Sequence, residues 1–220
     1  MHECRDRARM LGSYLDGELE AAKLIEIDEH VGECETCREE TQLLRAMRGS
    51  LKRVVRTGAN TLLTYHDPTE DLRIAEDDTV YLDFGPVFDE WEADFGRTYA
   101  LGNDPDKHRL VRDIGEAFRE GKEHFQRSPN LTAGELYDYV VALAPKKGWH
   151  FAAPTAGHLI GKFPHERLPD LKKRFSIRHG NEVSLREPDE TGAARHWILE
   201  IHFVDRERQF GGFLEELLTV

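Results

Sequence analysis

Apolar side chains in the first fifty residues recur at helical intervals. Met10, Leu11, Tyr14 and Leu15 form one apolar stripe, which predicts a helix over about 3–15. The next two stripes predict helices over about 19–32 and from near Cys34 to about 52, with a turn at Asp16-Gly17 between the first two helices. This part of the chain is therefore expected to be a small all-α module, residues 1–55.

The pattern changes in the remainder of the chain, residues 56–220. A short run rich in β-branched and aromatic residues predicts a buried strand over 79–83. Two helices are expected next, one from an Asp-Pro start at 104 to about 126, the other from a Thr-x-x-Glu capping box at 132 to about 144. Two further strand-like runs, at 197–204 and 213–218, complete an α+β pattern.

Composition narrows the class of protein. The 220 residues are 39% hydrophobic and 33% charged, with a formal net charge of −12, as in a globular protein. An acidic chain lacks the clustered cations that grip nucleic acid, and its apolar runs are too short to cross a membrane. Charges also stand near the N-terminus, where a signal peptide would be apolar, so we expect a cytoplasmic protein.

The three cysteines all lie within the first 37 residues, which disfavours a disulfide framework. His30, Cys34 and Cys37 form the pattern His-x3-Cys-x2-Cys, and Cys4 lies on an earlier segment. Three thiolates and one imidazole make a closed tetrahedral set, which predicts a structural zinc ion that stabilises a small module. The alternative is a Cys/His cluster without a metal.

The first module resembles the zinc-binding anti-sigma factor domain of bacteria. The resemblance rests on the run Ser-Tyr-Leu-Asp-Gly-Glu-Leu at 13–19, followed by His30, Cys34, Cys37 and Arg38. It covers about a quarter of the chain. It implies three or four helices, a structural zinc and a sigma factor as a partner.

Carboxylates and histidines of the second module stand among apolar neighbours or glycines. They are Asp83, Asp94, His158, Glu200 and Glu215. Singly, each is better explained as a structural residue, but buried carboxylates are costly unless they are paired or bind a metal. Two aspartates eleven residues apart, on strands that pair, can point to one place. The two aspartates therefore suit a bridged pair of metal ions.

This order of residues resembles the pita-bread metallopeptidases, that is, methionine aminopeptidases, Xaa-Pro aminopeptidases and prolidases. Asp-Phe-Gly at 83, Asp-Phe-Gly-Arg-Thr at 94 and Gly-His-x-Ile-Gly at 157 carry the resemblance. It implies that two divalent metals (Mn, Co, Fe or Zn) are held by Asp83, Asp94, His158, Glu200 and Glu215. It also implies catalytic roles for Glu200, which would move the proton, and for His165 and His66, which would contact the substrate and stabilise the oxyanion. The implied fold is a pita-bread domain, N-terminally truncated.

The implied chemistry agrees with the residue types. Four carboxylates and one imidazole are mostly hard oxygen ligands, which suit Mn, Fe or Co. Two such ions would lower the pKa of a shared water so that it attacks a peptide carbonyl at neutral pH. His158 must be neutral to ligate, so we expect the activity to fall at acid pH.

The sequence also departs from the family's pattern. The glutamate that the family follows with proline is here Glu200-Ile, whereas Glu187 precedes a proline but lies in a polar run that reads as a loop. Glu215 is chosen over the adjacent Glu216 by motif. Family members normally have a pair of helices ahead of the region of Gly58, where this chain has the zinc module.

Two classes of function remain open at this stage. The first is a metal-dependent aminopeptidase or dipeptidase that acts on a peptide substrate. The second is an anti-sigma-like regulatory protein whose peptidase-like domain is inactive or only binds peptides; a chimera is compatible with either. The expected partners are a peptide, a sigma factor through the first module and a second copy of the chain, with no nucleic acid and no membrane.

Overall fold

The computed structural model describes residues 7, 9–16, 18–49, 52–65, 67–88, 91–161 and 174–219. Contacts within the chain divide it into two compact units, residues 1–51 and 52–220. Residues 52–55, which the sequence pattern placed in the first module, belong to a strand of the second unit.

The first unit is helical. Its described helices are α2 (Leu11–Asp16), α3 (Ala21–Glu33) and α4 (Glu35–Gly49). Leu11, Ile27 and Cys37 form its buried centre. The predicted end of the third helix at about 52 is wrong, because the helix ends at Gly49 and position 52 already begins a strand.

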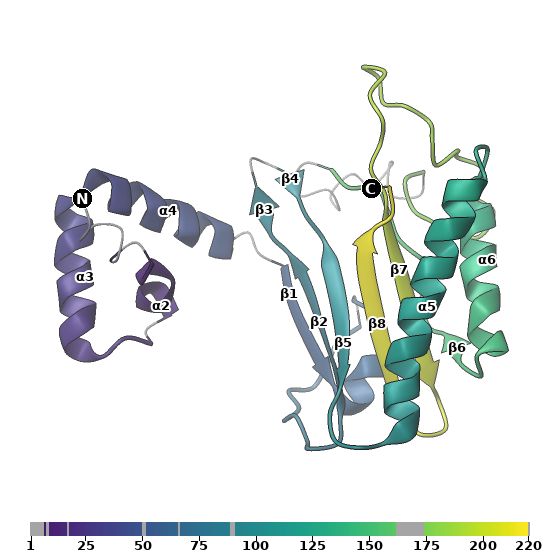
Figure 1. Ribbon diagram of the computed structural model, residues 1–220, viewed down its shortest axis with the longest axis horizontal. Helices are drawn as coiled ribbons and strands as arrows, with labels where there is room; N and C mark the ends of the chain where they lie inside the picture. Colours follow the sequence, from purple (N-terminus) through teal and green to yellow (C-terminus); the bar gives the residue numbers. More distant parts are fainter. Residues whose placement is uncertain are drawn as a thin grey trace. The chain divides into compact units, whose positions relative to one another are not determined.

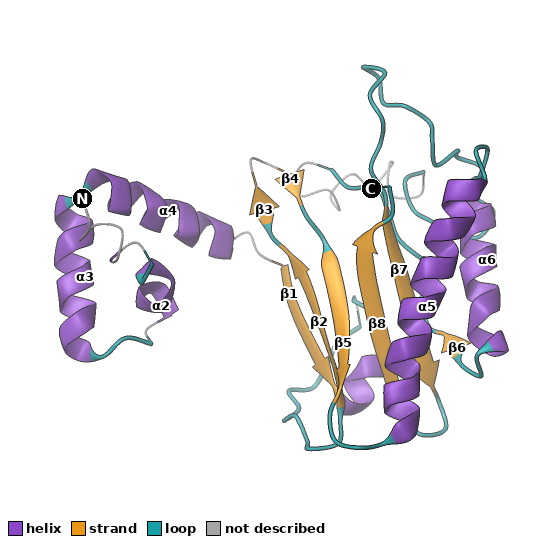
Figure 2. Ribbon diagram, viewed as in Figure 1, coloured by secondary structure: helices purple, strands orange, loops and turns teal. Residues whose placement is uncertain are grey.

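The second unit is built on one antiparallel sheet of six strands in the order β1-β2-β5-β8-β7-β6 (Figures 1 and 2). The strands are β1 (Lys52–Thr57), β2 (Thr79–Gly85), β5 (Phe95–Ala100), β6 (His150–Phe151), β7 (Ile198–Asp205) and β8 (Phe210–Leu217). A small hairpin of β3 (Val87–Phe88) and β4 (Trp91–Glu92) connects β2 to β5, and the 3-10 turn η1 (Gly58–Leu62) follows β1.

Helix α5 (Pro105–Arg127) covers one face of the sheet at β7 and β8, and helix α6 (Ala133–Lys146) packs beside α5 and against β6 (Figure 1). The predicted caps are present: Asp104 accepts a hydrogen bond from the amide of Asp106 at 2.9 Å, and Thr132 forms a capping box with Glu135. The second helix was expected to end at about Ala144, but it continues through Pro145, which lies in the last turn.

Successive side chains of β7 point alternately to the core and to the opposite face of the sheet. Leu199, Ile201 and Phe203 are fully buried and belong to the core that α5 and α6 complete. Glu200 and His202 point to the opposite face, because successive side chains of a strand alternate. The sheet thus has helices on one face and polar side chains at its centre on the other.

None of the described helices has both the length and the apolar character required to span a bilayer. The cytoplasmic location expected from the sequence stays a prediction.

Candidate metal centre

The register of the sheet aligns carboxylates in one row across four neighbouring strands. Asp83 on β2 is opposite Gly96 on β5, Gly96 is opposite Glu215 on β8, and Glu215 is opposite Glu200 on β7. Residues directly opposite each other in an antiparallel sheet share a face. The row therefore brings three carboxylates to one face from strands more than 100 residues apart in sequence.

Gly96 is the position without a side chain in this row. A Cβ atom there would lie 2.6 Å from Cε1 of Phe213 and 3.2 Å from Cβ of Glu215. Strand interiors disfavour glycine unless another group approaches the backbone closely, and here the neighbouring side chains occupy that space. The absent side chain lets Phe213 and Glu215 lie across β5.

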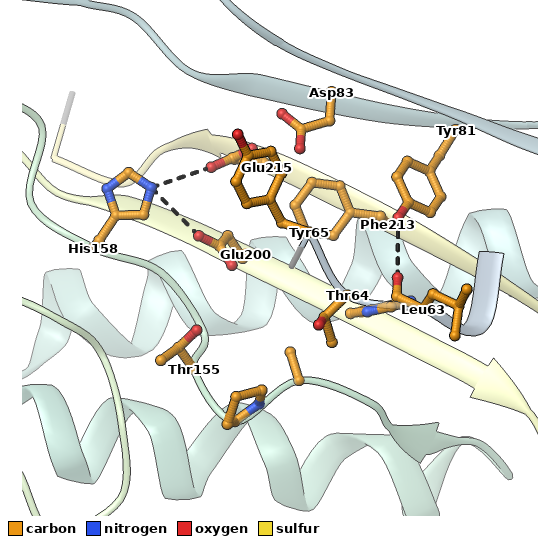
Figure 3. A pocket seen from close by; sticks show the side chains of 13 residues that line it. Leu63, Thr64, Tyr65, Tyr81, Asp83, Thr155, His158, Glu200, Phe213 and Glu215 are labelled. Carbon is orange, nitrogen blue, oxygen red and sulfur yellow. Dashed lines mark hydrogen bonds and ion pairs between the residues drawn. The ribbon is translucent and has the colours of Figure 1, made fainter. Parts of the chain in front are cut away.

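His158 faces the row from a segment after β6 (Figure 3). Its Nε2 lies 3.6 Å from Asp94, 3.5 Å from Glu200 and 3.6 Å from Glu215, measured to one carboxylate oxygen of each. Its Nδ1 lies 3.1 Å from the carbonyl oxygen of Leu159, which can only accept, so Nδ1 carries a proton. The other nitrogen is thereby directed to the carboxylates, as in histidines that bind metals.

Asp94, His158 and Glu215 could together hold a metal ion, because one ligand atom from each lies within 4.8 Å of the others. Asp83, Asp94 and Glu215 are buried, with exposed fractions of 4%, 5% and 1%. Several buried carboxylates around one imidazole are costly to gather without a compensating cation. The donor set, rich in oxygen with one nitrogen, suits divalent transition metals.

The protonation of His158 depends on this environment. Burial by itself lowers the pKa of the imidazole, but hydrogen bonds to Asp94 and Glu215 and the negative charge of Glu200 outweigh it and raise the pKa well above its usual value. The carboxylates thus attract a positive charge to this position, either a proton on His158 or a cation bound between the residues.

A cavity adjoins the carboxylates, and its far walls are mostly apolar. Tyr81, Phe213 and His202 form an aromatic corner, with ring centroids 5.4 to 6.1 Å apart. Further lining residues are Leu63, Thr64, Tyr65, Ala153, Pro154 and Thr155. Burial lowers the pKa of His202 to about 4, and its Nε2 lies 2.8 Å from the carbonyl oxygen of Thr61. His202 is therefore neutral at pH 7 and donates this bond.

The structure does not describe three of the predicted site residues. Cys4, His66 and His165 lie outside the described residues. Glu187, the Glu-Pro alternative, binds Arg174 at 2.7 Å and does not line the cavity. Glu216 pairs with Arg97, whereas Glu215 lines the cavity.

Three predicted ligands of the first unit are also close together. One ligand atom each of His30, Cys34 and Cys37 lies within 4.8 Å of the others. His30 lies in the last turn of α3, Cys34 is the residue between the two helices, and Cys37 is in the first turn of α4. The junction of the helices positions all three.

Sequence comparison gives the family. The sequence model of metallopeptidase family M24 matches residues 9–210, most of the chain. The chain belongs to this family. An Xaa-Pro dipeptidase of Lactobacillus helveticus is 28% identical over 142 residues, which cover 64% of this chain and 36% of that protein. This M24 chain thus spans about a third of the length of such curated relatives.

Solved structures agree on the fold. Prolidase from Pyrococcus furiosus superposes with a TM-score of 0.57 at 19% identity, over 75% of this chain and 44% of that one. Methionine aminopeptidase from Thermotoga maritima gives 0.56 at 18% identity, over 82% and 77% of the two chains. The expected α+β pita-bread-like fold is therefore confirmed.

Sequence reasoning assigned no role to two features of this M24 site. Gly96 was visible in the Asp-Phe-Gly motif, but its function depends on Phe213 and Glu215, which are distant in sequence. The aromatic corner had no signal of its own, because Tyr81 and Phe213 look like ordinary strand residues.

Proposed function

We propose that this chain is a metal-dependent aminopeptidase or dipeptidase, which releases an N-terminal residue or cleaves an Xaa-Pro bond. The observation that carries the proposal is the convergence of Asp94, Glu200 and Glu215 on Nε2 of His158, within 3.6 Å in each case. Membership of family M24 and the similarity to an Xaa-Pro dipeptidase support the reaction class.

In this proposal the row of carboxylates and His158 hold two divalent metals. Asp94, His158 and Glu215 form the compact set, and Asp83 and Glu200 complete it from the two ends of the row. Bound divalent ions would supply Lewis acidity and lower the pKa of a water. His158 ligates only as a neutral imidazole, so protons compete with the metal as the pH falls.

Glu200 is the proposed general base. It is the least buried carboxylate of the row and lines the cavity, so it borders the space that a substrate would enter. It would accept a proton from water and donate it to the leaving amine. The aromatic corner of Tyr81, His202 and Phe213 would take an apolar residue of the peptide. His66 and His165 stay predicted substrate contacts.

The test is release of free amino acid from Met-Ala-type and Xaa-Pro peptides by the full chain loaded with Mn²⁺. Glu200→Gln keeps the size of the side chain and is expected to lower kcat/KM by at least about 100-fold, because general-base catalysis is removed. Glu187→Gln is the matched control, since this glutamate binds Arg174 outside the cavity, and it should retain full activity. Equal activity in the two variants would contradict the assignment.

We also propose a structural zinc in the first unit, held by His30, Cys34, Cys37 and Cys4. The cluster of the first three supports it, and Nε2 of His30 is buried with no hydrogen-bond partner among the described residues. Such a site fits the second candidate function, an anti-sigma-like regulatory protein. The sigma factor and the homodimer stay predictions.

Metal content separates the two candidates. About three metals per chain, of which one resists mild chelation and two exchange, favour the peptidase with a zinc module. A single zinc favours the regulatory protein. Cys34→Ser should remove the resistant metal alone and leave the exchangeable metals in place, as measured by elemental analysis after dialysis.

A further inference from the structure

Arg56 on β1 is a buried cation close to the candidate site. Arg56 is only 5% exposed, and one nitrogen of its guanidinium, Nη2, donates hydrogen bonds to three main-chain carbonyls. The distances are 2.9 Å to Thr64, 3.3 Å to Tyr65 and 3.4 Å to Asp67. One side of the guanidinium, at Nη2, is therefore held by the carbonyls of a single turn.

This charge has no carboxylate neighbour within salt-bridge distance among the described residues. A buried arginine is usually compensated by an acidic side chain, because an unpaired charge is costly to remove from water. Here the carbonyl dipoles of the turn supply the compensation. If the turn moved, the buried cation would lose these hydrogen-bond acceptors, which would cost free energy. The cation therefore stabilises the turn in its present position.

The same turn is held from other sides. The carboxylate of Asp67 accepts hydrogen bonds from the amide and the hydroxyl of Thr64, both at 2.7 Å. The hydroxyl of Tyr81 donates to the carbonyl of Leu63 at 3.2 Å (Figure 3). The arginine thus acts on a segment whose own hydrogen bonds already close it into a compact turn.

This turn is one wall of the cavity. Leu63, Thr64 and Tyr65 line it together with Asp83, Glu200 and Glu215 (Figure 3). Tyr65 is 45% exposed, although it is a large aromatic residue, and it lines the cavity. Nothing in the sequence of β1 singles out Arg56, because its partners lie 8 to 11 residues further along the chain.

We propose that Arg56 is a positioning residue of the site, whose guanidinium holds Thr64 and Tyr65 as the wall against which the peptide binds. The proposal rests on the proposed peptidase function for its kinetic part. It implies that Arg56 contributes to binding of the substrate and not to binding of the metals, since it contacts neither the carboxylates nor His158 among its described interactions.

The first experiment compares Arg56→Met with wild type as Mn²⁺-loaded full chains. Loss of the Nη2 donor should release the turn, so KM for the peptide is expected to rise about tenfold while kcat changes less than about threefold, the pattern of lost uniform binding. The number of bound Mn²⁺ ions should be unchanged. Arg186→Met is the matched control, since Arg186 also donates to a carbonyl, that of Phe125 at 3.0 Å, but does not line the cavity.

Hydrogen exchange tests the same idea without turnover. In Arg56→Met the amides of 63–65 and 67 should exchange at least about tenfold faster, and those of β7 and β8 should be unchanged. If wild type shows no peptidase activity, the proposed function fails, and exchange still decides the role of Arg56. If KM and the exchange at this turn match wild type, or match Arg186→Met, the proposal is overturned.

Arg56→Lys covers the case in which Arg56→Met does not fold. Lysine keeps the positive charge, but its ammonium group sits on a shorter stem and cannot take the position of Nη2. We expect it to fold, with KM raised about threefold and intermediate exchange at the turn. If Arg56→Met does not fold and Arg56→Lys shows the same hydrogen exchange and KM as wild type, the proposal is overturned.

Discussion

At the scale of single residues, Gly96 controls how closely the carboxylates approach. It stands between Asp83 and Glu215 in the cross-strand row, and the ring of Phe213 fills the space where a side chain would be. A methyl group in a strand would normally be favourable relative to glycine, because it lowers the entropy of the unfolded chain. At this position the contact with Phe213 outweighs that gain.

Gly96→Ala is therefore expected to lower the free energy of unfolding by about 1–3 kcal/mol, the usual cost of overpacking. Because Glu215 must shift as well, the affinity for Mn²⁺ should fall. Gly115→Ala on α5 is the control: a Cβ there meets only Arg119, at 3.7 Å, and should raise stability by about 0.5–1 kcal/mol. Urea unfolding and calorimetric Mn²⁺ titration measure both effects, and a Gly96→Ala variant that binds Mn²⁺ like wild type would contradict this role.

His202 makes the stability depend on pH. Its pKa is lowered to about 4, mainly by burial, against an unfolded value near 6.5. The unfolded chain therefore binds more protons in this interval, so stability is fully present above about 6.5 and is lost as the pH falls through about 4. A shift of this size corresponds to about 3 kcal/mol.

In the metal-free protein, His202→Gln should remove most of this dependence, because glutamine can still donate to the carbonyl of Thr61 but does not titrate. The free energy of unfolding, followed by urea titration between pH 7 and 4, should decline less steeply than in wild type by up to about 3 kcal/mol. If the free energy of unfolding fell equally with pH in the two proteins, His202 would not be the source of the pH dependence.

Four of the candidate ligands could be chosen from sequence because each stands in a short motif, whereas Glu200 lacks the expected proline and was chosen as the carboxylate of an apolar, strand-like run. Asp83, Asp94, His158, Glu200 and Glu215 are the residues that the sheet and the segment after β6 bring together or place along one row. The roles of Gly96 and Arg56 could not be found in this way. Their partners are set by register and by a turn, which a local pattern does not encode.

At the scale of elements, the joint between β5 and β8 holds the two halves of the site together. Asp83 and Asp94 belong to the β2–β5 side, whereas Glu200 and Glu215 belong to the β7–β8 side. Among the described residues, Gly96 and Glu215 are the one pair aligned between β5 and β8. The hydroxyl of Thr98 reinforces it, donating to the carbonyl of Phe213 at 2.7 Å and accepting from its amide at 2.6 Å.

Thr98→Val keeps the shape of the side chain and removes both hydrogen bonds. The buried amide and carbonyl of Phe213 then lose their partner, so we expect a loss of about 1–3 kcal/mol in the free energy of unfolding and weaker Mn²⁺ binding. Thr191→Val, on an exposed loop, should change neither quantity by a comparable amount. If the Thr98 variant matches the loop variant, the joint does not depend on this hydroxyl.

Elements with strong local signals were predicted well, and those without them were not. The caps of α5 and α6 fixed where both helices begin, and the apolar runs located β2, β7 and β8. Strand β1 was missed because Lys52–Thr57 contains two arginines and a lysine and resembles a linker. It forms because an edge strand can pair with β2 without a hydrophobic face of its own.

At the scale of the whole molecule, two units carry two candidate metal sites of different chemistry. The first unit gathers imidazole and thiols at a junction of short helices, which suits a closed structural zinc. The second gathers carboxylates and one imidazole beside a cavity, which suits exchangeable ions and a substrate. The peptidase proposal depends on the second site alone.

The most direct test of that proposal is anomalous scattering from crystals of the full chain grown with Mn²⁺. We expect manganese peaks coordinated by Asp94, His158 and Glu215, with Asp83 and Glu200 as the further ligands. Peaks found only elsewhere, or a site without manganese at saturating Mn²⁺, would refute the proposed peptidase site.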